Sequence, residues 1–473
     1  MNGTPAATGR AEHDPAPMAR AERRVVLLAA LYAFFLMAAY AVLKPLRDEM
    51  GVQCGARNLK WLWLGTLVVT LLVLPPYWRL VGRWPRRRFI PWVYRGVAAT
   101  LLGFYAWFEF GAPAVKLGGV LLAQAALYVW ISVFNLLVLS VFWSLMADGF
   151  SAAQGRRRFG QIATGVTLGA LAGPWIALCF AEALDTFGLL LVSVALLEAA
   201  TQCARVVVRR VPETATGPVG TPAGDARPAT RPVNWLTRAA GVARSPYLLA
   251  IALFLFCSIV ASSFLYAQRT EIFRLAALDS ATRTRLFGWS DVATQSLTLL
   301  LQGVVAGALL RRFGSGAALA LQMAAGIAGF ALLAATLGGA DAFTAGEAAW
   351  HRWLGLPPVA LSPALLGVIL TGVALKGFEY GLAKPGREAL FTVVSRDEKY
   401  QAKSLIDTGL YRAFDQLSIW GYDLLSAACS LAACAALALA PLCAGIGLAF
   451  WLGREQSRRA APSPAAAPGS TPA

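Results

Sequence analysis

Long runs of apolar residues alternate with short polar segments along nearly the whole chain. About twelve of these runs reach the length of roughly 20 residues that a transmembrane helix needs. They cover residues 25–46, 59–81, 89–109, 115–147, 160–181, 187–208, 246–268, 286–310, 316–337, 361–383, 403–428 and 431–452. The pattern predicts an all-α polytopic membrane protein with about twelve transmembrane helices.

The composition and the placement of charge agree with a membrane protein and indicate its orientation. Of 473 residues, 58% are hydrophobic and 14% are charged, whereas soluble domains carry about 25% charged residues. Lys and Arg number 42 against 25 Asp and Glu, a net charge of +17, and they gather in loops on the side of the N-terminus. Such loops face the cytoplasm, so both termini are expected to be cytoplasmic. The positive charge indicates a basic face beside anionic lipid, and not nucleic-acid binding.

Polar segments divide the chain into five predicted parts. A tail over 1–24 precedes a six-helix bundle over 25–208, and a Pro- and Gly-rich linker over 209–245 leads to a second six-helix bundle over 246–452. A tail over 453–473, rich in Ala, Pro and Ser, is expected to be disordered. Two six-helix halves joined by a long loop are typical of major facilitator transporters, whose substrate lies between the halves near the middle of the membrane.

Motifs for common enzyme chemistry are missing. The only two His, His13 and His351, lie in polar segments, so the sequence offers no pair of His for a metal within the membrane. No Gly is followed by Lys, which excludes the Walker A loop of ATP-hydrolysing proteins. A non-enzymatic protein without a cofactor is therefore expected.

Ionisable residues within the apolar runs of the first half are candidate functional positions, since each costs about 2.5–3.5 kcal/mol in hydrocarbon. One cluster ends the first run: Lys44, Arg47, Asp48 and Glu49. It either faces a central cavity or lies at the membrane surface, with its cations extended to the lipid headgroups. Glu198, near the centre of the sixth run, either couples transport to a second ion or pairs with Arg205 or a neighbouring helix.

The second half carries its own ionisable residues. They are Arg269, Asp291, Lys376, Glu379, Asp407, Arg412 and Asp415. Lys376 and Glu379 are spaced to neutralise each other within one helix, and so are Arg412 and Asp415, so structural pairing and function both remain open. Asp291 begins a polar row with Gln295 and Gln302 and is a second candidate coupling residue.

Five cations are predicted to share one cavity and to bind an anionic substrate: Lys44, Arg47, Arg269, Lys376 and Arg412. A cationic site shielded from water attracts anions, and Arg holds phosphate or carboxylate with two hydrogen bonds. Asp48 and Glu49 are expected to balance the cations when the site is empty.

Two further features have structural interpretations. Arg95 lies close to a basic loop and is expected to extend toward the membrane surface. Gly165, Gly169 and Gly173 are spaced four residues apart in the fifth run. They predict a face of small residues that packs closely against another helix.

Two stretches carry a family resemblance. The first is Tyr40-Ala-Val-Leu-Lys44-Pro-Leu-Arg47-Asp48-Glu49, and the second is Glu379-Tyr380-Gly-Leu-Ala-Lys384-Pro385-Gly-Arg387-Glu388-Ala389, which continues through Lys403 and Asp407. Both resemble motifs of the bacterial and plastid ATP/ADP translocases, a nucleotide-transporter family distantly related to the major facilitators. Lys384 stands where the family pattern has Asp, and Arg387 where it has Lys.

The resemblance implies exchange of nucleotides or other phosphorylated anions at a cationic central site, in a bacterial inner membrane. Its functional or gating residues correspond to Lys44, Arg47, Asp48, Lys384, Arg387, Glu388, Lys403 and Asp407. Glu379, Asp407 and Asp415 are expected to join the cations near the ends of the tenth and eleventh runs in salt bridges that break and reform during transport.

The sequence as a whole favours an alternating-access transporter of small organic anions. Two alternatives remain: a proton-coupled carrier of the same fold, and a non-transporting membrane subunit that binds a cytoplasmic partner through the linker. The oligomeric state is left open, and a monomer would suffice.

Overall fold

The structure, a computed structural model, describes a large part of the chain. The described residues are 15–111, 115–117, 120–149, 152–180, 184–210, 242, 244–339, 342–343, 362–394, 403 and 405–460. Most of the predicted linker and tails, with His13 and His351, lies outside them. The described residues form helices and one two-stranded antiparallel hairpin, in which β1 (Lys116–Leu117) pairs with β2 (Val120–Leu121).

Six long helices form the first bundle. They are α1 (Pro15–Cys54), α2 (Leu59–Arg83), α3 (Arg86–Phe110), α4 (Leu122–Gly149), α5 (Ala152–Phe180) and α6 (Asp185–Arg210), with a short 3-10 turn, η1 (Ala56–Asn58), between α1 and α2. All six predicted runs fall on these helices. The fourth run was placed too early, because β1 and β2 lie within its first residues and α4 begins at Leu122.

The second bundle is more interrupted. Its helices are α8 (Pro246–Leu275), α9 (Ser280–Leu300), α10 (Ala306–Gly338), α11 (Pro363–Phe378), α12 (Lys384–Leu390), α14 (Tyr411–Ala428), α15 (Leu431–Leu437) and α16 (Leu439–Ala460). Three π-helical turns adjoin them: η2 (Leu301–Val305), η4 (Glu379–Ala383) and η6 (Leu405–Leu410). A 3-10 turn, η5 (Phe391–Val393), follows α12. Within α10 the chain bends at Gly314, whose φ of 75° is the left-handed conformation that Gly adopts at little cost.

Helix starts in the second bundle follow ordinary capping chemistry. The side chains of Ser245, Asp279, Ser362 and Ser430 accept hydrogen bonds from the backbone N–H groups three residues later. These caps satisfy donors that would otherwise be left open at the first turn. Pro246 and Pro363 follow their caps directly, where the missing N–H of Pro costs nothing.

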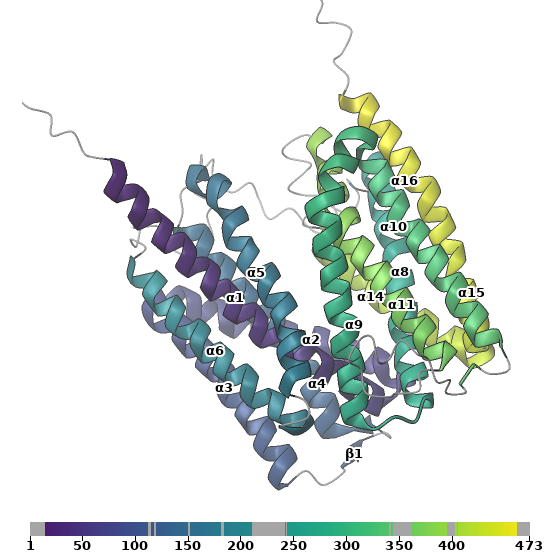
Figure 1. The fold of residues 1–473 in the computed structure, drawn as a ribbon, viewed down its shortest axis with the longest axis horizontal. Helices are drawn as coiled ribbons and strands as arrows, with labels where there is room; N and C mark the ends of the chain where they lie inside the picture. The colour runs from purple at the N-terminus through teal and green to yellow at the C-terminus, as the bar shows by residue number, and fades with distance from the viewer. Residues whose placement is uncertain are drawn as a thin grey trace, which may run out of the picture.

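Twelve membrane-crossing segments account for the described helices. Nine helical segments are long and apolar enough to cross a membrane, and one of them, Ser280–Gly338, contains the bend at Gly314 and so covers two predicted runs. The helices α3 and α14 are more polar but lie within the bundles beside the others (Figure 1). The fold class predicted from the sequence is confirmed, and the chain is an integral membrane protein.

The two bundles stand side by side and repeat one pattern of neighbours (Figure 1). In the first, α1 contacts α4, α5 and α6, and in the second, α8 contacts α11, α14 and α16. The start of α1 and the end of α16 lie at the same end of the molecule. We call this end the terminus side and the opposite end the far side.

The predicted small-residue face of α5 is confirmed. A Cβ on Gly165 would overlap the backbone of Ala30, one on Gly169 would overlap that of Phe34, and one on Gly173 would overlap Ala41. The absence of side chains therefore allows α5 and α1 to approach backbone to backbone. This contact fixes α1, which carries the first charged cluster, inside the bundle.

We predict that Gly169→Val lowers the thermal midpoint of the purified protein. The added side chain has no room against α1, and overpacking of this kind costs about 1–3 kcal/mol or more. Gly160→Val is the matched control, because Gly160 lies on the same helix and a Cβ there meets nothing within 4 Å. Equal midpoints for the two variants in the same detergent would contradict the close packing of α1 and α5.

Candidate functional site

A cavity of about 400 Å³ lies between the two bundles and is lined by residues from both. Five cationic side chains and three carboxylates face it: Lys44, Arg47, Arg269, Lys376 and Arg412, with Asp48, Asp291 and Asp415. All five cations that the sequence analysis assigned to one cavity are thus brought together. Their expected roles in substrate binding stay predictions.

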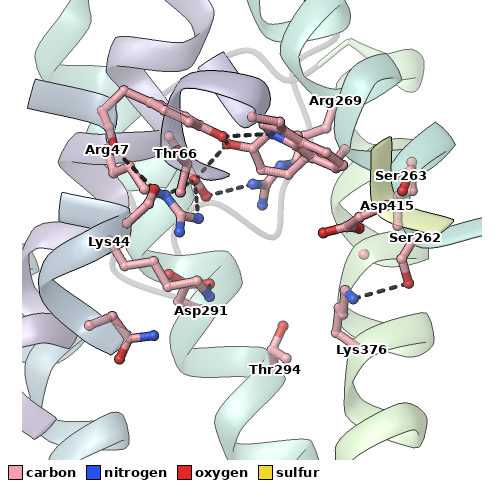
Figure 2. A pocket seen from close by; sticks show the side chains of 18 of the residues that line it. Lys44, Arg47, Thr66, Ser262, Ser263, Arg269, Asp291, Thr294, Lys376 and Asp415 are labelled. Atoms are coloured by element: carbon pink, nitrogen blue, oxygen red, sulfur yellow. Dashed lines mark hydrogen bonds and ion pairs between the residues drawn. The ribbon is translucent and has the colours of Figure 1, made fainter. Parts of the chain in front are cut away.

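Asp48 is the centre of the charge network. Its side chain is only 2% exposed and accepts hydrogen bonds from Arg47 on the same helix and from Arg269 on α8, at 2.7 and 2.5 Å. The hydroxyl of Tyr266 donates a third, at 3.1 Å. Asp48 therefore joins α1 of the first bundle to α8 of the second, and Figure 2 shows Arg47 and Arg269 at the cavity.

Aromatic side chains surround these arginines. The indole of Trp63 donates to the hydroxyl of Tyr128, which lies 3.0 Å from that of Tyr266. The guanidinium of Arg47 lies 5.8 Å from the ring centre of Tyr128, and that of Arg269 lies 5.1 Å from Tyr266. Cation–π contacts and hydroxyl hydrogen bonds hold both arginines in place, so the site is organised before any ligand arrives.

A second ion pair joins the bundles deeper in the cavity. The ammonium of Lys44 on α1 lies 2.5 Å from Asp291 Oδ1 on α9. The other oxygen of Asp291 is buried and has no hydrogen-bond partner among the described residues. Gln295 lines the cavity one helical turn further on, as the predicted polar row implies. Gln302 is exposed and does not line it.

The second bundle contributes a cationic group of its own. The Lys376 ammonium lies 2.8 Å from Glu379 and donates to the hydroxyl of Ser262 at 3.0 Å (Figure 2). Arg412 lines the cavity from α14 and forms no hydrogen bond or ion pair with any other described residue. Pairing of Arg412 with Asp415, one of the two interpretations left open, is therefore not made as a salt bridge, although both side chains face the cavity.

Two π-helical turns flank this group. The turn η4 begins at Glu379, directly after the helix that carries Lys376, and η6 ends at Leu410, directly before Tyr411 and Arg412. Such turns interrupt the regular hydrogen-bond ladder and recur at functional sites. Hydropathy alone does not predict them, because they leave the apolar pattern unchanged.

Three contacts between the bundles close the far side of the cavity. Lys60 of α2 forms an ion pair with Asp423 of α14, and the rings of Trp61 and Trp420 meet edge to face with centres 5.1 Å apart. Glu49 accepts two hydrogen bonds from Arg283 of α9, at 2.6 and 2.7 Å. Glu49 therefore balances Arg283 in the closure, and not the cavity cations as predicted.

The sequence analysis missed Lys60, Asp423 and Arg283. Each lies near a helix end, where a charge at the membrane surface needs no partner, so nothing singled it out. The described residues form four ion pairs between the bundles, which are Lys60–Asp423, Glu49–Arg283, Asp48–Arg269 and Lys44–Asp291. All four pairs lie in the far half of the molecule, so the described contacts hold the bundles together on that side.

Several predicted residues lie away from the cavity. Glu198 does not line it and instead accepts two hydrogen bonds from Arg95 on α3, at 2.8 and 3.2 Å. The expectation that Arg95 extends to the membrane surface is wrong, because this carboxylate holds it. The pairing of Glu198 with a neighbouring helix is the alternative left open above, and its proposed coupling role stays untested.

Four other residues taken from the resemblance do not line the cavity: Lys384, Arg387, Glu388 and Lys403. Lys403 and Glu388 form an ion pair, and the ammonium of Lys384 lies 5.9 Å from the ring of Tyr380. Arg387 lies in α12. Asp407 belongs to η6, but its side chain is not among the described ones.

Comparison with known proteins supports the fold. No protein-family model matches the chain, and no curated protein matches it by sequence. A bacterial homologue of the iron transporter ferroportin, in an inward-facing state, is similar with a TM-score of 0.60 and 13% identity over 92% of this chain and 99% of its own. An auto-inhibited POT family peptide transporter has a TM-score of 0.58 and 13% identity over 94% and 99%. The nucleoside transporter NupG has 0.52 and 14% over 92% and 99%.

These similarities place the chain in the major facilitator-like fold, in agreement with the two-bundle architecture. The three solved structures are described as transporters. Identities of 13–14% carry the fold alone. The resemblance to ATP/ADP translocases receives no support from these comparisons.

We predict that Lys60→Glu opens the far side, because it places a carboxylate against Asp423. A single cysteine at Ser132, which lines the cavity, then reacts several-fold faster with a membrane-impermeant maleimide added to intact cells, whose surface the far side is expected to face. Native cysteines are replaced by alanine in all variants.

Two controls accompany this test. The exchanged pair Lys60→Asp with Asp423→Lys is expected to restore slow labelling. Arg57→Glu, a similar charge change at the same end of the molecule but outside this pair, is expected to leave it slow. Slow labelling of Lys60→Glu, or equally fast labelling of Arg57→Glu, would contradict the assigned closure.

Proposed function

We propose that the chain is an alternating-access transporter of small organic anions, with nucleotides as the first substrates to test. The observation that carries the proposal is the cavity between the bundles, where cations from both halves converge. Charged side chains within a membrane cost free energy, so their presence in the cavity needs a reason. Structural support alone would not require cations to exceed carboxylates in a cavity.

The charge balance of the cavity favours an anion. Five cations face three carboxylates, and Glu379 pairs with Lys376 from beside them, so positive charge remains in excess. The N–H groups of Arg412 donate no hydrogen bond to any other described residue. A guanidinium of this kind suits phosphate or carboxylate, which it can hold with two hydrogen bonds.

The size and the aromatic lining suit an organic anion with a planar part. A volume of about 400 Å³ lies within the range of small-molecule sites, about 300–1,000 Å³. Trp63 and Tyr128 line one side, and Tyr380 and Tyr411 the other. Rings at these positions can stack on a base or another conjugated group.

The same ion pairs suggest how a substrate triggers movement. Asp48 and Asp291 hold cations across the bundle boundary when no anion is present. An incoming anion competes for Arg269 and Lys44 and so weakens the bonds between the halves. Because only differential binding to two states shifts their populations, this competition gives the substrate a way to release the closed far side.

The nucleotide as first candidate comes from the sequence resemblance at Lys44, Arg47 and Asp48, all of which line the cavity. One of the solved structures with a similar fold is described as a nucleoside transporter. Other phosphorylated or carboxylated anions fit the same cavity chemistry. Exchange, as against one-way uptake, follows from the resemblance and not from the geometry.

We predict that liposomes holding the purified protein and preloaded with ADP or ATP take up labelled ATP, and that Arg412→Gln slows uptake about 10- to 100-fold. Losing a hydrogen bond to a charged group costs about 1.5–3 kcal/mol. This variant breaks no ion pair of the empty protein, unlike Lys44→Ala, which leaves Asp291 without its cation and tests the same cavity at greater structural cost. Lys116→Ala is the control, because Lys116 lies exposed on β1.

The outcomes separate the parts of the proposal. Uptake in Arg412→Gln equal to that of the wild type would remove the cavity as the binding site. If folded protein takes up no ATP with any preload, nucleotides are excluded as substrates. Other phosphorylated and carboxylated anions would then be screened with an imposed pH gradient.

One observation favours proton coupling as a second function. Asp291 is 6% exposed, faces the cavity and leaves one oxygen without a hydrogen-bond partner among the described residues. A carboxylate in that setting can take up a proton when Lys44 leaves it for a substrate. The Lys44–Asp291 pair would then carry one proton together with the anion at each turnover.

We predict for this second function that a pH gradient accelerates uptake in the wild type and has no effect in Asp291→Asn. The amide keeps the shape of the carboxylate but cannot titrate. Glu198→Gln is the control for a carboxylate away from the cavity. A gradient effect that persists in Asp291→Asn and disappears in Glu198→Gln would assign coupling to Glu198 instead.

A further inference from the structure

A charged pair lies on the outer surface of the first bundle, far from the cavity. Arg95 of α3 and Glu198 of α6 form two hydrogen bonds, yet their side chains stay 49% and 40% exposed. Glu198 lies near the midpoint of α6, which runs from Asp185 to Arg210. At that depth the exposed surface faces hydrocarbon, and the nearest headgroups are about 15 Å away.

Such a position is costly for a monomer. Charged side chains within the membrane usually face the interior of a bundle or a wet cavity. Here the polar surface continues along α6, since Glu198 also accepts from Gln202, and Arg205 donates to Gln202 at 3.3 Å. Arg95 and Glu198 satisfy only part of each other's hydrogen-bonding capacity. Polar groups from another protein surface would therefore stabilise these side chains by shielding them from lipid.

The neighbouring face of α3 leaves room for a helix from outside the chain. Gly96, Ala99, Gly103 and Ala106 follow one another along its exposed side. A Cβ placed on Gly96 or Gly103 meets nothing within 4 Å. Small residues let a helix from outside approach the backbone closely. In α5 the same kind of face is already covered by α1, whereas on α3 it is open.

The equivalent face of the second bundle lacks these charges. The helices α10 and α16 take the positions of α3 and α6, and their exposed mid-helix residues include Leu321, Leu332, Cys443 and Phe450. Among the described residues, no charged side chain lies in the central part of that face. The fold itself therefore does not require a charged pair at this depth.

We propose that two copies of the chain dimerise in the membrane through the α3–α6 face. The central pair of this surface is one cation and one carboxylate, Arg95 and Glu198, so the pair is complementary to a second copy of itself. A two-fold axis brings identical patches together, which sets each Arg95 beside Glu198 of the partner subunit. The four charges then complete one another's hydrogen bonds away from lipid, and the open glycines let the two α3 helices approach.

The test counts subunits of the full-length protein. Protein carrying one fluorophore is reconstituted in liposomes at low density, and bleaching steps are counted for each particle. We expect mostly two-step bleaching for the wild type and a several-fold loss of two-step particles for Gly103→Ile. Gly447→Ile, on the exposed face of α16, is the control and is expected to keep the dimer, since a Cβ at either glycine meets nothing in the monomer.

Two further variants test the face itself. The double variant Arg95→Leu with Glu198→Leu removes the charges without leaving one unpaired, and we expect it to be monomeric. In a cysteine-free background, Gly96→Cys is expected to give a covalent dimer with a short bifunctional reagent, and Gly447→Cys is not.

Several results would overturn the proposal. They are single-step bleaching of the wild type, equal loss of dimer in Gly103→Ile and Gly447→Ile, an intact dimer in the double leucine variant, or equal cross-linking at both cysteine positions. A monomeric wild type would assign the face to a different membrane protein.

Discussion

The sharing of Asp48 between Arg47 and Arg269 is the interaction on which the central cavity depends. A charge in a low-dielectric interior must be paired and hydrogen-bonded, or it destabilises the fold. Asp48 meets that requirement with one partner from each bundle, and Tyr266 completes its shell. The position of α1 against α8, the alignment of the tyrosines and the gathering of cations all follow from it. Breaking such a pair from one side is far more costly than never having formed it.

The sequence predicted the helices and much of the cavity, for one physical reason. Hydrocarbon excludes unpaired polar groups, so long apolar runs predict transmembrane helices. Charged residues within these runs are costly and therefore mark candidate functional positions. Lys44, Lys376 and Arg412 were found in this way, and each lines the cavity. The glycine face of α5 was equally readable, because close helix packing requires small residues at a fixed spacing.

Partners across the chain could not be predicted in the same way. Lys60 and Asp423 are 363 residues apart, and no spacing rule connects them. The two interpretations of Glu198 stayed open for a related reason: hydropathy gives the depth of a residue but not the face of the helix on which it lies. Arg283 looked like an ordinary charge at the membrane surface until the second bundle placed it against Glu49.

The excess of positive charge in the cavity has a consequence for the membrane voltage. When a cavity that carries net charge is exposed first to one side of a bilayer and then to the other, fixed charge is displaced through part of the electric field. Moving one full charge across the field is worth about 2.3 kcal/mol per 100 mV. An anion that neutralises the cavity removes this sensitivity. The lining of Lys44, Arg47, Arg269, Lys376 and Arg412 therefore makes the return of an empty carrier, more than the passage of a loaded one, depend on the electrical state of the membrane.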